Sequence, residues 1–214
     1  MHDISNLILD LGGVLFHVDY DRTAEAFVAA GCPDFKSWYS QKQQRPLFDD
    51  LETGRINATN FRDAIRSASE KVLTDQQIDH AWNAMLIGFP IESVELVIRL
   101  SEQYRLFLLS NTNPIHEIAF RRMFSDTHPT LEFDSLFEKV YLSHHIGMRK
   151  PEKEIFDLVM EENGLNADAT VFVDDSIQHV EGARRAGLHA LWLEKQGETE
   201  KLLMDSGLIG QRRS

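Results

Sequence analysis

Residues 6–13 read NLILDLGG, and this stretch decides the fold. A short apolar run from Ile4 to Leu9 ends in Asp10, and Gly12-Gly13 then breaks the pattern. Such a run is typical of a strand in a parallel sheet, whose two faces are both covered. Four later apolar runs look alike: 106–109, 140–142, 171–173 and 190–193. The sequence therefore predicts five buried strands.

The segments between these runs have helical period. In the segment from Pro90 to Ser101, Ile91, Val94 and Val97 fall on one face of a helix. Three further segments of this kind cover residues 114–124, 152–163 and 176–187. Because strands and helices alternate, we expect an α/β fold with a doubly wound, Rossmann-like parallel sheet.

Residues 19–89 lack this alternation and contain no convincing strand. The segments 21–30 and 59–68 are helical in pattern, and Thr74 to Gln77 has the form of a capping box. An apolar stripe at helical spacing follows, formed by Ile78, Ala81, Trp82, Met85 and Leu86. We therefore predict an α-helical cap domain at 19–89, inserted into a core domain of residues 1–18 and 90–214, with Trp82 and Met85 packing inside the cap.

Composition excludes several classes of partner. The formal charge of −12 argues against a nucleic acid or an anionic membrane, since both attract a positive face. No apolar run approaches the roughly 18–20 residues that span a bilayer. The single cysteine, Cys32, permits no intrachain disulfide, and no secretory signal pattern opens the chain, so we expect a cytoplasmic protein. The negative charge does not argue against a phosphate substrate, because a few local cations and a metal decide that question.

Polar residues follow the predicted strands at the points where the strands end. They are Asp10, Ser110-Asn111 and Asp174-Asp175, with Lys150 in the loop after the third strand. Ligands of open parallel sheets bind at the carboxyl ends of the strands, so these side chains are expected to converge. Converging carboxylates repel one another unless a cation neutralises them, and Mg²⁺ prefers oxygen ligands. A carboxylate beside the ion can attack phosphorus and form an aspartyl-phosphate.

Four motifs occur in order along the chain: Asp10-Leu11-Gly12-Gly13-Val14-Leu15, Leu108-Leu109-Ser110-Asn111, Lys150-Pro151 and Val173-Asp174-Asp175-Ser176. With these motifs the chain resembles a haloacid dehalogenase (HAD) superfamily phosphatase with a helical cap. Residues 109–113 and 147–151 most resemble the bacterial alpha-D-glucose-1-phosphate phosphatase branch. The resemblance implies a phosphatase that hydrolyses a small phosphorylated metabolite such as a sugar phosphate, with Mg²⁺ as cofactor.

The resemblance also implies a role for each matching residue. Asp10 would be the nucleophile and a metal ligand, and Gly12 would offer its main-chain carbonyl to the ion. Asp174 and Asp175 would complete the Mg²⁺ site, and whether Asp174 touches the ion directly is open.

The remaining motif residues would act on the phosphate. Ser110 and Asn111 would bind it, and Lys150 would bridge it to Asp10. The expected catalytic set is thus Asp10, Ser110 and Lys150.

Gly12 departs from the usual pattern. Most phosphatases of this superfamily carry an aspartate there, which protonates the leaving group and later activates water. A positioned general acid typically contributes about 10²- to 10⁴-fold. His17, Asp19 or a residue of the insert would have to replace it, although a capping role for Asp19 is the simpler reading.

Three other functions are open alternatives. A haloacid dehalogenase attacks carbon without a metal, and the acid pair after the fourth strand argues against it. A phosphomutase depends on the acid that Gly12 lacks. A binding module without turnover is favoured by Gly12 alone. The adjacent His144 and His145 are expected to point apart as solvated loop residues, which is the wrong geometry for sharing a metal.

Overall fold

Five parallel strands form the central sheet of the protein, whose computed structural model describes residues 4–39 and 45–210. The strand order is β5-β4-β1-β6-β7. Their bounds are β1 Asn6–Leu9, β4 Arg105–Ser110, β5 Lys139–Leu142, β6 Thr170–Asp174 and β7 His189–Trp192. The chain winds outward from β1 in both directions, so the predicted doubly wound α/β fold is confirmed.

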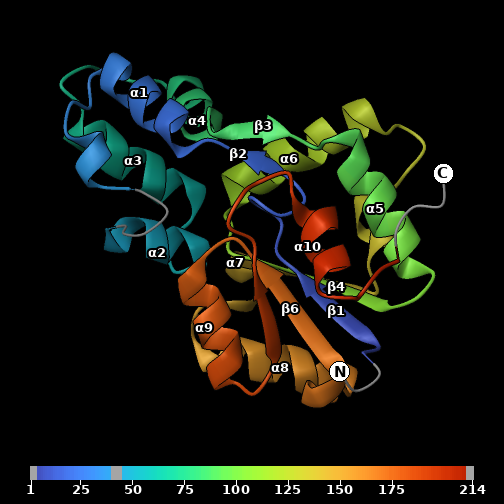
Figure 1. Cartoon of the computed structure of the whole chain (residues 1–214). Helices are drawn as coiled ribbons and strands as arrows, with labels where there is room; N and C mark the ends of the chain where they lie inside the picture. The colour runs from blue at the N-terminus through green and yellow to red at the C-terminus, as the bar shows by residue number, and fades with distance from the viewer. Residues whose placement is uncertain (1–3, 40–44, 211–214) are drawn as a thin grey trace.

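Helices cover both faces of this sheet because successive strand side chains point to opposite sides. Leu7 and Leu9 of β1 pack in the cluster that also contains apolar residues of α5, α6 and α10, whereas Ile8 packs with α8 and α9. Figure 1 shows α8 and α9 on one side of the strands and α5 and α10 on the other. The bounds are α5 Ile91–Ser101, α6 Pro114–Thr127, α7 Ser143–Ile146, α8 Lys153–Asn163, α9 Ile177–Arg185 and α10 Thr199–Asp205.

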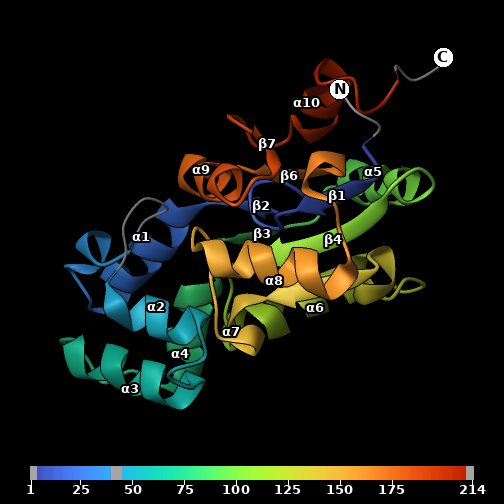
Figure 2. The ribbon, with the colours of Figure 1, turned by 90° about the horizontal axis from the view of Figure 1, so that it is seen from below.

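Four helices form a separate layer beside the core. They are α1 Tyr20–Ala30, α2 Pro46–Glu52, α3 Ala58–Ala68 and α4 Asp75–Asn83. Figure 2 shows them grouped at one end of the molecule. They enclose an apolar cluster of their own, centred on fully buried Trp82 and four phenylalanines, and Met85 is buried in it too. The predicted packing role of Trp82 and Met85 is therefore confirmed.

A two-stranded antiparallel ribbon joins the two layers. It consists of β2 His17–Val18 and β3 Leu86–Gly88. The expectation of no strand within residues 19–89 is wrong, because β3 lies there and α4 ends at Asn83 rather than continuing through Leu86. The ribbon depends on pairing between segments almost 70 residues apart, which local periodicity does not reveal.

Several helix caps that the sequence predicts are present in the structure. The side chain of Asp19 caps α1 by accepting from the Asp21 N–H at 3.1 Å, and Thr74 and Gln77 form a capping box. Gly164 ends α8 in the left-handed conformation. Three short 3₁₀ helices complete the elements, at Phe35–Ser37, Phe133–Leu136 and Ala167–Ala169.

We propose a division between a core of 1–18 and 90–214 and a cap of 19–89, because the buried apolar residues of α1 to α4 share one cluster, to which Ile115 of the core also belongs. These ranges include residues 1–3, 40–44 and 211–214, which lie outside the described residues. Within the described ranges, no helix has both the length and the apolar character that crossing a bilayer requires.

Candidate functional site

Three carboxylates lie together beside the cap, at the carboxyl ends of strands β1 and β6. Asp10 follows β1, Asp174 is the last residue of β6, and Asp175 comes next. One carboxylate oxygen from each of the three residues lies within 4.8 Å of the other two. The convergence expected from the parallel sheet is therefore present.

A buried lysine lies between two of these acids. The Nζ atom of Lys150 donates to Asp10 Oδ1 at 2.7 Å, to Asp174 Oδ2 at 2.6 Å and to the Leu109 carbonyl at 2.9 Å. The lysine side chain is fully buried, so these three acceptors satisfy all of its N–H groups. Burial alone would lower the pKa of Lys150, but the charges of Asp10 and Asp174 outweigh it and raise the pKa. Lys150 is thus a fixed cation.

The side chain of Asn111 holds the main chain of Lys150. Its Nδ2 donates to the Lys150 carbonyl and its Oδ1 accepts from the Lys150 N–H, both at 2.9 Å. Both polar atoms of this amide are therefore engaged in positioning the lysine. Ser110, one residue earlier, ends β4 and lines the cleft around Asp10.

Asp174 is held by protein groups on both oxygens. Its Oδ1 accepts from the Ser176 N–H at 2.7 Å and lies 3.0 Å from Nδ1 of His179, while Oδ2 accepts from Lys150. His179, in the first turn of α9, was not predicted as a site residue. Burial would raise the pKa of Asp174, but the charges of Lys150 and His179 outweigh it and hold the pKa at about 2.

The other two carboxyl groups have raised pKa values. Burial raises the pKa of Asp10 to about 6, although the Lys150 ammonium opposes it. Burial, and then the charges of Asp10 and Asp174, raise the pKa of Asp175 to about 8. A nearby cation would favour the ionised form of these clustered oxygen donors, and a hard divalent ion such as Mg²⁺ fits them.

The two glycines after β1 have different constraints. A Cβ atom on Gly12 would meet only Cγ1 of Val18, at 3.5 Å, which is an ordinary contact. Gly13 has φ +77°, and a Cβ atom there would lie 2.1 Å from Oδ2 of Asp175. Position 13 therefore requires glycine, whereas position 12 has room for a side chain.

Of the three predicted substitutes for the missing acid, His17 and Asp19 do not line the cleft around Asp10, whereas residues of the insert do. Asp19 caps α1, and His17 belongs to β2. Side chains from the cap do line it, namely Tyr20, Tyr39 and Glu52. Local sequence gives no signal for the two tyrosines, since their direction depends on how the cap packs against the core.

Arg149 connects the two sides of this cleft. It ion-pairs with Asp49 and, through Nη2, with Glu52 Oε2 at 2.9 Å, both on α2. The cleft holds a cavity of about 80 Å³, lined by Asp10, Gly12, Tyr20, Tyr39, Glu52, Ser110, Asn111, Arg149, Lys150, Asp175, Ser176 and His179.

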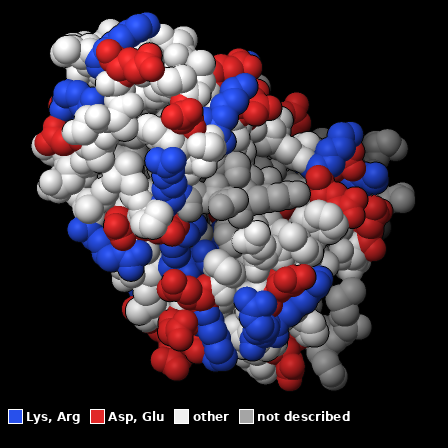
Figure 3. Space-filling model, turned by 90° about the vertical axis from the view of Figure 1, so that its left-hand side faces the viewer, with Lys and Arg blue, Asp and Glu red and all other residues white. Residues whose placement is uncertain are grey.

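The side of the molecule that carries the cap has acidic and basic side chains interspersed (Figure 3).

The expectation that His144 and His145 point apart into solvent is wrong. The two residues lie in the short helix α7, and both rings turn toward Glu117, with ring centroids 4.2 Å apart. The side chain of His144 is only 4% exposed. The Glu117 carboxylate, which comes from another element, supplies the attraction that sequence adjacency cannot reveal.

Comparison with known proteins gives consistent matches. Residues 94–193 match the family described as haloacid dehalogenase-like hydrolase. The D-ribitol-5-phosphate phosphatase of Bacteroides thetaiotaomicron is 29% identical over 185 residues, which cover 86% of this chain and 89% of that protein.

Solved structures resemble the whole chain. A HAD family enzyme of Bacteroides thetaiotaomicron, an aspartate-to-alanine variant in complex with magnesium and inorganic phosphate, has a TM-score of 0.86 and 37% identity over 91% of this chain and 96% of that one. A HAD-like family hydrolase of Porphyromonas gingivalis has a TM-score of 0.85 and 34% identity over 97% and 99% of the two chains.

Proposed function

Because the chain belongs to the haloacid dehalogenase-like hydrolases and is a phosphatase with Mg²⁺ as its cofactor, we propose that it cleaves a small phosphorylated metabolite through an aspartyl-phosphate on Asp10. The observation that carries this proposal is the position of the Asp10 carboxylate. It lies at the end of the central strand, 2.7 Å from a buried ammonium and beside two further acids.

Asp10 is the nucleophile in this proposal. One of its oxygens forms a bond to phosphorus while the bond from phosphorus to the substrate oxygen breaks, and that oxygen takes a proton from water. A water molecule then attacks the aspartyl-phosphate, which releases inorganic phosphate and restores the Asp10 carboxylate. Lys150 keeps one Asp10 oxygen in place, so the attacking carboxylate is oriented before substrate arrives. The Ser110 hydroxyl and nearby main-chain N–H groups donate to the phosphoryl oxygens, whose charge must be stabilised in the transition state.

Asp10, Asp175 and the Gly12 carbonyl are the proposed Mg²⁺ ligands. The bound ion would supply positive charge that neutralises the carboxylates and the phosphate. Asp174 positions the groups around these ligands rather than binding the ion, because its two oxygens accept hydrogen bonds from Ser176, His179 and Lys150. Asn111 positions Lys150, and the second N–H of its side-chain amide is left to contact phosphate.

The substrate that we propose is a phosphorylated sugar or sugar alcohol. The cap side of the cleft offers two phenol groups, Tyr20 and Tyr39, and the ion pair of Glu52 with Arg149. Such donors and acceptors suit the hydroxyl groups of a polyol better than an apolar group. The name of the relative that acts on D-ribitol 5-phosphate supports the same class.

The first test replaces the nucleophile. With Mg²⁺, wild type should hydrolyse p-nitrophenyl phosphate and polyol phosphates, whereas Asp10→Asn should lose activity at least about 10³-fold, because an amide cannot attack phosphorus. Chelation of the metal should have a comparable effect. Asp168→Asn, an exposed acid at the opposite end of β6, is the matched control and should keep wild-type rates.

One result would favour a binding module instead. If wild type and Asp10→Asn were equally inactive on aryl phosphate and across a panel of sugar phosphates, the chain would have kept the fold without turnover. Chloride release from 2-chloropropionate in the presence of chelator would favour a dehalogenase.

The second test supplies the missing acid. Gly12→Asp places a carboxyl group where a Cβ has room, so the variant should fold. If no other group protonates the leaving oxygen, turnover of alkyl phosphates should rise by up to about 10²-fold. Turnover of p-nitrophenyl phosphate should change little, because p-nitrophenolate departs without being protonated. Equal effects on both substrates would show that protonation does not limit the reaction.

A reducing compartment, the cytoplasm, fits the single cysteine. Cys32 is buried within the cap cluster, and burial raises the pKa of its thiol, which makes it a packing residue rather than a nucleophile.

A further inference from the structure

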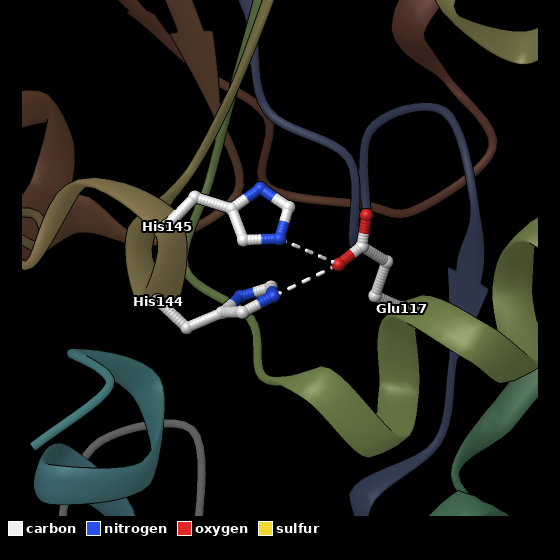
Figure 4. Close-up of side chains that lie close together, drawn as sticks. All are labelled: Glu117, His144 and His145. Carbon is white, nitrogen blue, oxygen red and sulfur yellow. Dashed lines mark hydrogen bonds and ion pairs between the residues drawn. The ribbon is translucent and has the colours of Figure 1, made fainter. Parts of the chain in front are cut away.

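A second group of metal-binding side chains lies outside the cleft around Asp10. It consists of Glu117, in the first turn of α6, with His144 and His145 of α7. Figure 4 shows both rings directed at the same carboxylate oxygen. The Nε2 atoms of the two histidines each lie 2.9 Å from Glu117 Oε2, and the three ligand atoms are within 4.8 Å of one another.

The donor set is that of a transition-metal site. Two imidazole nitrogens and one carboxylate oxygen suit Zn²⁺ and its neighbours Co²⁺ and Ni²⁺, whereas Mg²⁺ prefers oxygen ligands alone. Zinc bonds of about 2.0–2.2 Å in a tetrahedral arrangement put neighbouring ligand atoms roughly 3.3–3.6 Å apart. The distances of 2.9 Å from Glu117 Oε2 to the two imidazole nitrogens are slightly shorter than this, and all three ligand atoms lie within 4.8 Å of one another, so small side-chain movements would admit the ion.

The three ligands are held by the fold, and the site is open to solvent on one side. The side chains of His144 and Glu117 are 4% and 16% exposed, whereas that of His145 is 57% exposed. An ion can thus enter past His145 and meet two ligands already in place. Three protein ligands leave the fourth tetrahedral position to water.

Surrounding groups orient the carboxylate. The Nε atom of Arg121 donates to Glu117 Oε1 at 2.8 Å, which leaves Oε2 for the histidines, and Asp134 balances the charge of Arg121 through a 2.9 Å ion pair. In the described part of the chain, Nδ1 of His144 meets no acceptor. Hydrogen-bond partners of metal ligands typically contribute about 10- to 100-fold in affinity for the metal. Because Glu117 has such a partner and Nδ1 of His144 does not, we expect a metal site of moderate affinity.

We propose that Glu117, His144 and His145 bind a transition-metal ion of the Zn²⁺ class, separate from the magnesium site, and that this ion ties α6 to α7. Helix α7 is already connected to the loop after β4, because the Ser143 hydroxyl accepts from the Thr112 N–H and donates to the Thr112 carbonyl, both at 2.9 Å. A metal at this position would therefore brace the loop that follows Ser110 and begins with Asn111.

Zinc binding in the presence of excess Mg²⁺ tests the proposal, because Mg²⁺ occupies the oxygen-only site. Equilibrium dialysis should leave one Zn²⁺ bound per wild-type chain. His145→Ala should weaken this binding by at least about 10- to 100-fold, since it removes a ligand rather than a supporting group. His145 is exposed, so the variant should fold. His80→Ala, an exposed histidine on α4, is the matched control and should bind as wild type does.

A second readout identifies the ligands. Wild-type protein with Co²⁺ in excess Mg²⁺ should show the visible absorption bands of a nitrogen-ligated tetrahedral ion, and Glu117→Gln, which keeps the side-chain size, should weaken them. If His145→Ala retained Zn²⁺ as wild type does, or if Mg²⁺ displaced all of the bound Zn²⁺, the three residues would be a hydrogen-bonded cluster only and the proposal would be overturned.

Discussion

The carboxylate of Asp175 occupies the space that a side chain at position 13 would need. A Cβ on Gly13 would lie 2.1 Å from Asp175 Oδ2, and the residue has φ +77°. We predict that Gly13→Ala displaces Asp175 and also costs about 1–2 kcal/mol for the left-handed backbone. The variant should lose most of its activity and its response to Mg²⁺.

Urea unfolding with and without Mg²⁺ measures this response. A ligand that binds only the folded state stabilises it by about 2.7 kcal/mol at a hundredfold excess over its Kd. Wild type should show this gain and Gly13→Ala should not. Gly12→Ala is the matched control, since a Cβ at that position meets one ordinary contact, and it should keep the gain. A full Mg²⁺ response in Gly13→Ala would mean that Asp175 is not a ligand.

At the residue scale, sequence reasoning identifies the groups that strand ends bring together and misses the groups that converge from elsewhere. Asp10, Asp174 and Asp175 meet because parallel strands end at one edge. His179 reaches Asp174 from the first turn of α9, and His144 and His145 turn inward to Glu117. Each of these contacts joins side chains of two elements, and no local pattern encodes their approach.

At the element scale, a histidine joins helix α6 of the core to α4 of the cap. His116 lies against Trp82 with ring centroids 4.6 Å apart, and its Nε2 lies 3.1 Å from the Trp82 carbonyl. Burial lowers the pKa of His116 to about 4, and the hydrogen bond to Trp82 opposes this only in part. The imidazole is therefore neutral in the folded protein at neutral pH.

Because His116 is buried in its neutral form, the free energy of unfolding should depend on pH. The unfolded state binds the proton near pH 6.5 and the folded state only near pH 4, so the contribution of His116 is complete above pH 6.5 and is lost as the pH falls toward 4. The loss is at most about 3 kcal/mol. Unfolding free energies of wild type and His116→Gln, compared from pH 7 to 4, should converge at the acid end.

The exposed His80 supplies the control for this comparison. The stability of His80→Gln should run parallel to that of wild type over the same pH range. Should the curves of wild type and His116→Gln also run parallel, the acid sensitivity would have to come from other groups.

Elements with a strong periodic pattern are predictable, and short elements are not. The five sheet strands and the longer helices follow from apolar runs and end signals. Helices α2, α7 and α10 span seven residues or fewer, and the β2–β3 ribbon pairs two and three residues. Such elements are stabilised by tertiary contacts, for example the 2.7 Å hydrogen bond from the Thr199 hydroxyl to the Val14 carbonyl.

At the scale of the whole molecule, the cap limits access to the proposed active site. The cavity between cap and core is about 80 Å³, whereas small-molecule sites are typically about 300–1,000 Å³. A sugar phosphate therefore needs the cap to move away before it can enter and before the product can leave. The sequence predicts that a cap exists, but which of its side chains close the cleft depends on the packing of two separately formed layers.

Arg149 is the residue that we expect to hold this closed arrangement. It comes from the core loop beside Lys150, and its ion pairs with Asp49 and Glu52 reach α2 of the cap. Glu52 is 5% exposed, so removing the arginine leaves a buried carboxylate without this partner. A hydrogen bond to a charged group contributes about 1.5–3 kcal/mol, which corresponds to a tenfold or greater shift toward the open state.

Hydrogen exchange measures that shift. In Arg149→Met, the amides of α2 should exchange about tenfold faster or more than in wild type, whereas those of β1 and β6 should be unchanged, because the core is not loosened. Arg122→Met, which removes an 82% exposed arginine that pairs with Asp126 across one turn of α6, is the control and should leave α2 exchange as it is. Equal exchange of α2 amides in wild type and Arg149→Met would show that apolar contacts hold the cap closed. The role of Arg149 would then be to contact the substrate.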